Sequence, residues 1–513
     1  MHPLIPASLR LGAVVIGAVL AAPLASAQYT YGRYLEPPDG SILQGMGQFW
    51  GPSTDNQQYL DALAPYGEGV MPGHDMFIVN ISPSAIDDGH FGTFDAHAQT
   101  VLLSQLQESA DAQRIPHVAI SFLNYNAHFL PGMGQHKPTA HDIDVADDDA
   151  PMHDFMLNQI TLVGQTLAAF GQPVFVRIGL EFNNPSVVDG AEGYHAFYFP
   201  IAYRKTVKAL EAAGAERCAY IWCWQASAPT TYADVDPVTG LAAWYPGDEY
   251  VDWFGLDIFN RNQFTALPSP IYPLAASQLP DVEEFLAFAE NRSRPVFVAE
   301  SACVDYDIVA GDANESLVNW FLPFFTFLAN HPSIKAVTYI SHDWTGGSGG
   351  APLWKDSRIA NSSQVTFAWA HAMGLSAFIG KRSGPFLNGY DGWWGLGNSL
   401  PGAKGDPLLR GFGALHPGQP VTLELTNAKP HTLAALFVGF SAIDLPFKGG
   451  VMVPKPEIVV DGLHTDETGH LTLMTTWPDQ VPSGFRTYYQ CWIADATQPL
   501  GLAASNALLG ESL

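Results

Sequence analysis

Cationic side chains and cysteines are scarce in this sequence of 513 residues. It holds 23 lysines and arginines against 50 aspartates and glutamates, which gives a formal net charge of −27. An excess of acid this large repels nucleic acid and anionic membrane surfaces, so we expect neither as a partner, whereas a neutral polysaccharide is compatible with it. Four cysteines do not make a dense disulfide framework, and the pairing of Cys218, Cys223, Cys303 and Cys491 stays open.

Long apolar runs are also missing. After residue 27 no segment of 18 or more apolar residues occurs, so we predict no membrane span. Residues 1–27 carry one charge, Arg10, followed by an apolar run at 11–20 and small residues at 25–27. This pattern is typical of a secretory signal peptide and predicts a secreted protein, extracellular or periplasmic.

The usual motifs for cofactors and metals are absent. No glycine-rich phosphate loop follows the first apolar run at 42–48, and no HExxH or Cys/His spacing indicates zinc. The acidic stretch at 141–154 lacks the central glycine and final glutamate of a calcium loop. We interpret it as a solvated acidic loop, with calcium as the alternative, and expect neither a metal nor a cofactor.

What the sequence does contain is a regular series of short apolar, β-rich runs. They lie at 42–48, 76–82, 115–124, 173–183, 218–225, 251–259, 295–302 and 336–344. Helix-period segments lie between several of them, at 96–113, 197–214 and 281–292, the last with Asp281 as its expected N-cap. Eight alternations of strand and helix predict an α/β fold, a (β/α)8 TIM barrel over residues 28–375, with an open doubly wound sheet as the competing architecture.

Two of these runs each end in a glutamate. In PVFVRIGLEFN at 173–183 an uninterrupted strand leads to Glu181, and strand alternation puts Arg177 on the same face. In PVFVAESAC the same design leads to Glu300. If these runs are strands four and seven of a barrel, both glutamates would lie at its carboxyl-terminal face, where active sites form. Glycoside hydrolysis uses two such carboxyl groups, whereas the plainer interpretation is a structural arginine–carboxylate pair.

The sequence resembles the clan A glycoside hydrolases, and among them most closely the family 26 β-mannanases. The resemblance rests on RIGLEFN at 177–183, YPGDEYVDWFGLD at 245–257 and PVFVAES at 295–301, which are similar to the strand-four, strand-six and strand-seven motifs. It covers roughly residues 40–375, by a strand-by-strand match to an eight-unit barrel. What it implies is a secreted, metal-independent retaining hydrolase, endo-acting on mannan or a related β-1,4-linked polymer.

The resemblance also implies the roles of the two glutamates: Glu181 is the acid/base and Glu300 the nucleophile. Glu181 must then hold a proton at the working pH while Glu300 stays ionised, and Arg177 would favour the ionised Glu300. Carboxyl groups about 5–5.5 Å apart would retain the anomeric configuration. Two positions depart from the family, because Leu180 replaces the histidine before the acid/base and Phe259 replaces a strand-six tyrosine.

A sugar cleft needs aromatic faces and polar donors at the strand ends. The candidate substrate-binding residues are Trp50, Asn124, Arg177, Asn183, Trp224, Phe259, His342 and Trp344. The resemblance implies that Trp344 forms the floor of the sugar site. Helix packing is the alternative for Trp224, a satisfied histidine is the alternative for His342, and Asp257 could hydrogen-bond within the barrel instead of touching substrate.

The composition of the sequence and the spacing of its apolar runs change after about residue 374. Residues 376–408 are rich in glycine and contain Trp393-Trp394, which indicates a structured connection. Runs at 421–428, 432–440, 456–464, 470–477 and 485–495 alternate with turns and predict a small antiparallel β-sandwich over 409–513. Carbohydrate binding and a structural or surface-attachment role are both open for it.

A second hypothesis for the whole chain is a non-catalytic carbohydrate-binding or surface protein, against which the two glutamates argue. The oligomeric state is unknown.

Overall fold

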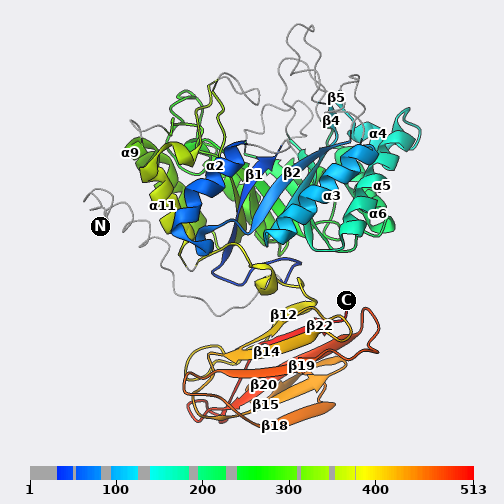
Figure 1. Cartoon of the computed structure of the whole chain (residues 1–513), viewed down its shortest axis with the longest axis vertical. Coiled ribbons are helices and arrows are strands. Elements are labelled where there is room, and N and C mark those ends of the chain that lie inside the picture. Colours follow the sequence, from blue (N-terminus) through cyan, green and yellow to red (C-terminus); the bar gives the residue numbers. More distant parts are fainter. Residues whose placement is uncertain are drawn as a thin grey trace. The chain divides into compact units, whose positions relative to one another are not determined.

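The structure is a computed structural model, and its description covers most of the chain. It describes residues 30, 32–49, 54–81, 94–124, 139–183, 194–226, 240–308, 313–345, 353–375 and 377–513. The chain divides into two compact units, of which residues 42–383 form the first, and residues 32–41 with 384–513 form the second (Figure 1). The predicted leader at 1–27 lies outside the described residues.

Eight parallel strands form a closed barrel in the first unit. In sequence order they are β1 (Ile42–Phe49), β2 (His74–Asn80), β3 (Ile115–Ser121), β6 (Val174–Glu181), β7 (Cys218–Gln225), β8 (Trp253–Ile258), β9 (Val296–Ser301) and β10 (Ile334–Ile340). Each strand pairs with the next, and β10 pairs with β1, for example through Leu43 and Ala336. The predicted (β/α)8 barrel is therefore confirmed, and the open doubly wound sheet is excluded.

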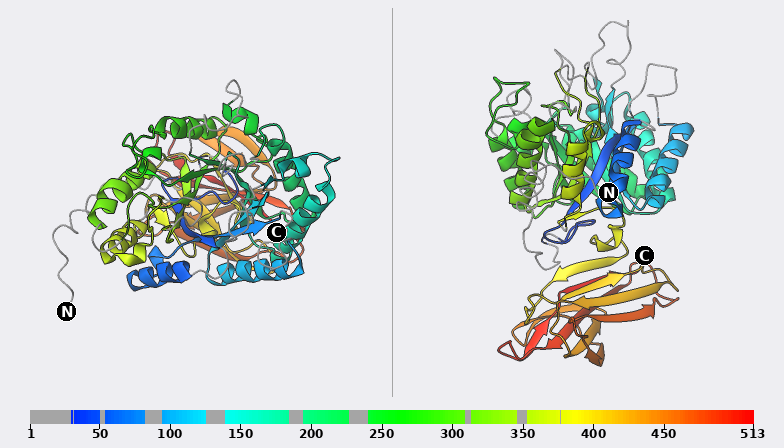
Figure 2. Two further views of the ribbon diagram at one scale, coloured as in Figure 1. Left: turned by 90° about the horizontal axis from the view of Figure 1, so that it is seen from above. Right: turned by 60° about the vertical axis from the view of Figure 1, so that its left-hand side comes forward.

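Helices surround this barrel (Figure 2). They include α2 (Thr54–Leu63), α3 (Ala96–Asp111), α5 (His153–Phe170), α6 (Phe199–Ala212), α8 (Leu279–Glu290), α10 (Leu322–Asn330) and α11 (Ser363–Met373). The predicted N-cap at Asp281 is wrong, because the cap is Gln278 and α8 begins with Leu279 and Pro280. Proline suits this first turn since its missing N–H would have no helical partner there. Asp281 lies in the first turn instead, where a negative charge favours the helix dipole.

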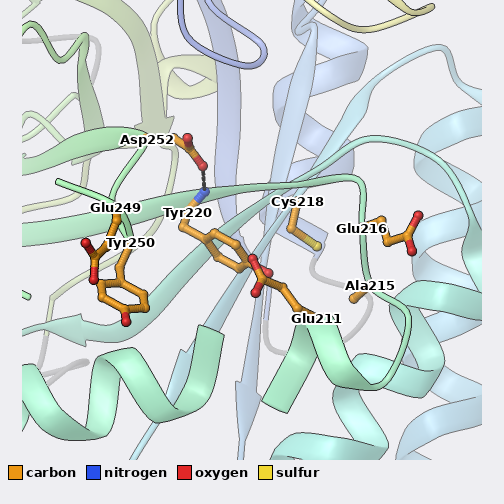
Figure 3. Close-up of a pocket in the computed structure, with 8 residues that line it drawn as sticks. All are labelled: Glu211, Ala215, Glu216, Cys218, Tyr220, Glu249, Tyr250 and Asp252. Atoms are coloured by element: carbon orange, nitrogen blue, oxygen red, sulfur yellow. Dashed lines mark hydrogen bonds between the residues drawn. The ribbon is translucent and has the colours of Figure 1, made fainter. Parts of the chain in front are cut away.

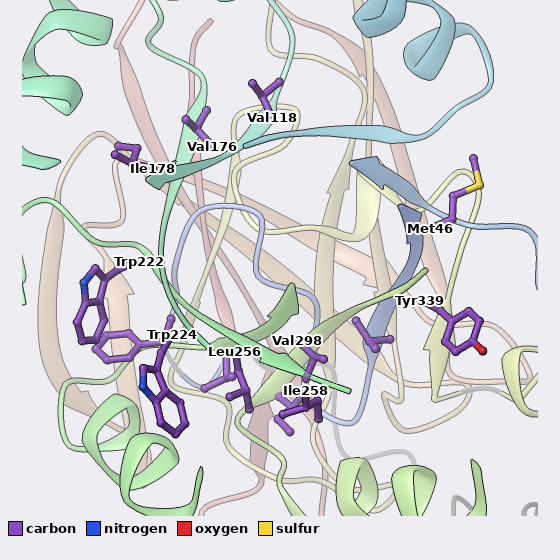
Figure 4. Close-up of a cluster of buried hydrophobic side chains, with 14 of the residues drawn as sticks. Met46, Val118, Val176, Ile178, Trp222, Trp224, Leu256, Ile258, Val298 and Tyr339 are labelled. Carbon is purple, nitrogen blue, oxygen red and sulfur yellow. The ribbon is translucent and has the colours of Figure 1, made fainter. Parts of the chain in front are cut away.

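Apolar side chains on the outer face of the strands hold the helices against the barrel. Figure 4 shows Trp222 and Trp224 on β7 directed outward, with Leu256 and Ile258 on the neighbouring β8. The Trp222 ring stacks on Phe182 at a centroid distance of 4.3 Å and is fully buried. This packing uses the period-two alternation of the strands, so the opposite side chains point into the barrel.

Two buried histidines, His74 on β2 and His117 on β3, lie inside the barrel. Both rings contact Phe297 at centroid distances of 5.0 Å. His74 Nε2 contacts the Val337 carbonyl at 3.0 Å, whereas neither ring nitrogen of His117 has a hydrogen-bond partner among the described residues. Burial lowers the pKa of His74 to about 3 and that of His117 well below its usual value, helped there by the charge of Arg177. Both imidazoles are therefore neutral in the folded barrel.

We expect these two histidines to make the barrel sensitive to acid. Below a pH of about 6.5 these two histidines bind protons in the unfolded chain but not in the folded barrel. The free energy of unfolding therefore decreases as the pH falls toward 3. Between pH 6.5 and 5 the loss is about 2 kcal/mol for each histidine. Urea denaturation at pH 7 and 5 measures it. His117→Gln should reduce the difference between the two pH values, while replacement of the exposed His371 on α11 should leave it unchanged.

The second unit consists of antiparallel sheets. One has the order β12 (Trp393–Gly397), β22 (Ala507–Glu511), β20 (Arg486–Ala494), β15 (Leu433–Gly439) and β18 (Ile458–His464), and β21 (Leu502–Ala504) also pairs with β20. Another contains β13 (Leu408–Phe412), β14 (Pro420–Thr426) and β19 (Leu471–Thr476), and β16 (Ala442–Phe447) pairs with β17 (Gly450–Pro454). The first two sheets share one apolar cluster, in which Leu436 and Leu423 take part. Antiparallel sheets are thus confirmed for this region, and Trp393 of the predicted connection belongs to one of them.

Two further findings concern the cysteines and the long apolar segments. Each of the four cysteines lies in the described part of the chain and carries a free, buried thiol. No helix among the described residues is long and apolar enough to cross a bilayer.

Candidate active site

The two glutamates of the motifs lie at the carboxyl-terminal end of the barrel strands. Glu181 is the last residue of β6, and Glu300 is the second-last residue of β9. In the sheet register Glu181 is opposite Cys223 on β7, and Glu300 is opposite Asp257 on β8. Their exposed fractions are 8% and 6%, so each carboxyl group is largely desolvated and still has some surface at the barrel mouth.

The strand that carries Glu181 is not uninterrupted, as the sequence pattern predicts, but bulged. Between the pairs Arg177–Ile221 and Glu181–Cys223, four steps along β6 match two along β7. The extra residues lie at Gly179 and Leu180, whose φ angles are +79° and +56°. A left-handed conformation at a leucine costs about 1–2 kcal/mol, and strain of this kind is characteristic of functional sites. The bulge sets the direction in which Glu181 leaves the strand.

Gly179 is required at this bulge for two reasons. Its φ angle favours glycine, and an added Cβ would lie 2.5 Å from Cε2 of the buried Phe199 ring. We expect Gly179→Ala to lower the free energy of unfolding by about 2–4 kcal/mol, because backbone strain and overpacking add. Gly69→Ala is the control, since its Cβ would meet nothing within 4 Å. Equal denaturation midpoints for the two variants would contradict this role of Gly179.

Arg177 links the two glutamates from inside the barrel. Its guanidinium is fully buried, Nη1 donates to Glu300 Oε1 at 2.6 Å, and Nη2 donates to Asp257 Oδ2 at 2.5 Å. Its Nε donates to the carbonyl of Leu180, immediately before Glu181, at 3.1 Å. Burial opposes the charge, but the surrounding carboxylates outweigh it and raise the pKa of Arg177 further. The guanidinium of Arg177 therefore holds Glu300 directly, and it also holds the bulge before Glu181 through the carbonyl of Leu180.

Asp257 is a third carboxyl group between the other two. Besides accepting from Arg177, it hydrogen-bonds with Glu181 and accepts from the Cys223 thiol at 3.4 Å. Burial raises the pKa of Asp257 well above its usual value; the charges of Glu300 and Glu181 add to this, and Arg177 opposes it. The expected alternative for Asp257, a hydrogen bond within the barrel, is what the structure shows. The contacts of Asp257 with Arg177 and with Glu181 were not predicted, because a single sequence does not show which side chains lie at the same height inside the barrel.

The β10 end of the site carries two further candidates, His342 and Trp344. His342 Nδ1 contacts Asp55 Oδ2 at 2.8 Å, and its ring lies edge-on to Trp344 at 4.7 Å. Trp344 Nε1 donates to Ser357 Oγ at 3.0 Å and the residue is 7% exposed. Asp55 lies in α2, more than 280 positions from His342 in the sequence. The two residues come together because the barrel closes between β1 and β10.

Phe259 and Asn183 are near the glutamates but face protein. Phe259 is 4% exposed and packs against Trp354, with the two rings tilted at a centroid distance of 4.7 Å. Sequence reasoning missed Trp354 because it lies in a loop. Asn183 exchanges two 2.8 Å hydrogen bonds with the backbone of Gln225, which fixes the segment after Glu181 to the end of β7. Asn183, like Phe259, is only 4% exposed.

Three remaining candidates are not brought to the site by the described structure. Trp224 packs on Phe285 of α8 at 5.2 Å, so the alternative of helix packing holds for it. Trp50 lies outside the described residues, and the side chain of Asn124 also falls outside them.

The acidic stretch at 141–154 is only in part the solvated loop that its composition predicts, because Asp147, Asp148 and Asp149 are exposed whereas other parts are helical. Residues Asp142–Ala146 form α4, where the buried Asp142 accepts from the His195 backbone N–H at 2.8 Å. Asp148 pairs with Lys205 at 2.5 Å. The described residues contain no group of three or more histidines, cysteines or acids placed to hold a metal ion.

A cavity of about 380 Å³ lies at the opposite end of the barrel wall (Figure 3). It opens beside Cys218, the first residue of β7, and its lining includes the acids Glu211, Glu216, Glu249 and Asp252. Because Glu181 and Glu300 lie at the other strand ends, this cavity is separate from the candidate active site.

Comparison with known proteins gives distant relatives. No protein-family model matches the sequence. The chain is 25% identical to the β-1,3-xylanase TXYA of a Vibrio species over 237 residues, which are 42% of this chain and 46% of that protein. It is 25% identical to a β-1,3-xylanase of an Alcaligenes species over 244 residues, 43% and 47% of the two chains. The chain spans about half the length of the curated relatives it matches.

Solved structures with a similar backbone trace include two family 26 mannanases. A modular endo-β-1,4-mannanase of Cellulomonas fimi gives a TM-score of 0.45 at 13% identity, covering 95% of this chain and 99% of that chain. A family 26 β-mannanase of Bacteroides ovatus gives 0.43 at 14% identity, covering 72% and 95%. These two relatives and these two solved structures thus carry the names of two different glycanases.

Proposed function

We propose that this chain is a retaining β-glycoside hydrolase acting on a polysaccharide. The observation that carries the proposal is the buried network in which Arg177 donates to Glu300 and to Asp257, while Asp257 hydrogen-bonds with Glu181. Two carboxyl groups at one rim have different partners, so they can hold different protonation states. Glycoside hydrolysis uses two carboxyl groups that differ in protonation state.

The reaction follows from these partners in two displacements. Glu300, whose negative charge is paired with Arg177, attacks the anomeric carbon while Glu181 gives its proton to the departing glycosidic oxygen. The bond to the leaving sugar breaks and a glycosyl ester on Glu300 forms. Glu181, now ionised, takes a proton from water, which displaces Glu300 and releases a product with the original anomeric configuration.

For the substrate we favour β-1,3-xylan, with β-1,4-mannan as the second candidate. Both relatives found by sequence are named β-1,3-xylanases, at 25% identity over more than 230 residues. The motif resemblance favours mannan, but this chain has Leu180 and Phe259 where that family has histidine and tyrosine. Both positions adjoin the catalytic strand ends, so these departures fit a different sugar.

We further propose that the protein is exported and that its second unit has an accessory role. Residues 1–27 carry the signal pattern, and a polymeric substrate has to be cleaved outside the cell. For the antiparallel sheets, binding to a polysaccharide and attachment to a surface are both consistent with the proposed activity.

Release of reducing sugar from a panel of polysaccharides tests the proposal. The panel contains β-1,3-xylan, β-1,4-xylan, β-1,4-mannan and a β-glucan. We expect turnover of one xylan or of mannan by the parent protein, and none by Glu300→Ala or Glu181→Gln. Binding of a glycan without hydrolysis across the panel would instead favour the non-catalytic hypothesis. Full activity in either variant would refute the assignment of the glutamates.

A further inference from the structure

A buried thiol lies directly beneath the proposed catalytic carboxyl groups. Cys223, on β7, is 1% exposed, and its Sγ donates to Asp257 Oδ1 at 3.4 Å. Burial raises the pKa of this thiol well above its usual value, the neighbouring acids add to this, and Arg177 opposes it. The sulfur therefore keeps its proton at neutral pH, and it acts as a donor, not as a thiolate.

The neighbouring strand makes room for this thiol. Gly255 on β8 is opposite Cys223, and a Cβ added at Gly255 would lie 2.6 Å from Cys223 Cβ and 2.7 Å from Sγ. Any larger residue at position 255 would push the sulfur away from Asp257. Two positions on adjacent strands thus combine to place one weak donor against one carboxylate oxygen.

The thiol completes the hydrogen bonding of Asp257. Arg177 Nη2 donates to Oδ2, and the Cys223 thiol donates to Oδ1, so each oxygen has its own donor. The charged or titratable groups that face Asp257 are Arg177 and Glu181 from β6, Cys223 from β7 and Glu300 from β9. Both donors favour the ionised Asp257, whereas burial and the two glutamates favour its acid form.

We propose that Cys223 is a positioning residue of the active site, whose thiol donates to Asp257 Oδ1 and fixes that carboxyl group in rotation beside Glu181. The inference rests on the proposed function, because it concerns the acid that Asp257 contacts. A fixed Asp257 carboxyl group keeps its hydrogen bond with Glu181, and this holds the Glu181 side chain in the orientation that the first displacement needs. Without the thiol donor, the Asp257 carboxyl group is free to rotate, and Glu181 loses its fixed orientation in part of the molecules.

The pH dependence of kcat distinguishes this role from simple packing. For Cys223→Ala we expect kcat to fall about 3- to 10-fold with KM nearly unchanged, and the acid limb to move up by about half a pH unit. Cys223→Ser, which restores a donor, should move the limb back toward that of the parent. Cys218→Ala is the matched control, because Cys218 is also a buried thiol of β7 but lies at the other end of the strand. Thermal denaturation shows that each variant is folded.

A second measurement does not depend on turnover. The infrared difference spectrum of parent minus Cys223→Ala isolates one S–H stretching band, which shifts to lower frequency when the thiol donates to a carboxylate. We expect this shift near neutral pH. A band at the frequency of a free thiol, or a parental pH profile in Cys223→Ala, would overturn the inference. A parent protein that cleaves no polysaccharide but shows the shifted band would reject the proposed function and keep the hydrogen bond.

Discussion

Replacing Glu300 with glycine is expected to lower kcat by about 10⁴-fold or more, since no other group can form the glycosyl ester. The cavity left by the carboxyl group admits a small anion. Azide should therefore restore cleavage of an aryl β-glycoside of the sugar that the parent protein accepts. Because azide attacks from the side that Glu300 occupied, the product should be the α-glycosyl azide. Product analysis by NMR measures both the rescue and the configuration.

The same experiment on Glu181 gives the opposite stereochemistry. Glu181→Gly keeps the nucleophile, so the ester on Glu300 still forms from an aryl glycoside with a good leaving group. Azide then displaces Glu300 and gives the β-glycosyl azide. A β-azide from the Glu300 variant, or an α-azide from the Glu181 variant, would show that the two roles are exchanged or absent.

Replacing Arg177 with methionine is expected to damage both stability and activity. The fully buried Asp257 and the largely buried Glu300 would lose their counter-charge, which costs about 3–5 kcal/mol of unfolding free energy. We expect kcat/KM to fall about 10³-fold as well, because the nucleophile loses its donor and the Leu180 carbonyl loses its anchor. Chemical denaturation and steady-state kinetics measure the two effects separately.

Arg294 provides the control for this variant. It is also buried, but its guanidinium donates to backbone carbonyls, among them that of Val251 at 2.6 Å, and not to a carboxylate. Arg294→Met should destabilise the protein while the folded fraction keeps its kcat/KM. Similar activity losses in the two variants would show that Arg177 acts only through stability.

The fold could be predicted from the sequence because its signals are local and repeated. Runs of β-rich residues spaced by helical segments identify all eight barrel strands, and the carboxyl-terminal positions of Glu181 and Glu300 follow from strand order alone. Helix boundaries were less accurate, as Asp281 shows, because Gln278 and Pro280 are also compatible with a helix start.

The details of the site depend on relations that are not local. The bulge at Gly179 and Leu180 is invisible in a sequence that reads as a continuous strand, because the backbone angles there are fixed by the neighbours Phe199 and Arg177. Similarly, Trp224 satisfies the composition of a sugar site but faces α8, because the alternation of β7 points it outward. Aromatic content alone does not say which side of a strand a residue occupies.

The central claim is that Glu300 forms a covalent bond to the substrate while Glu181 supplies and recovers the proton. A 2-deoxy-2-fluoro β-glycoside of the accepted sugar slows the second displacement, so the ester accumulates and peptide mass spectrometry can locate it. The account predicts one adduct per chain, on Glu300. An adduct on Glu181 or Asp257, or release of an α-configured product with no adduct, would contradict it.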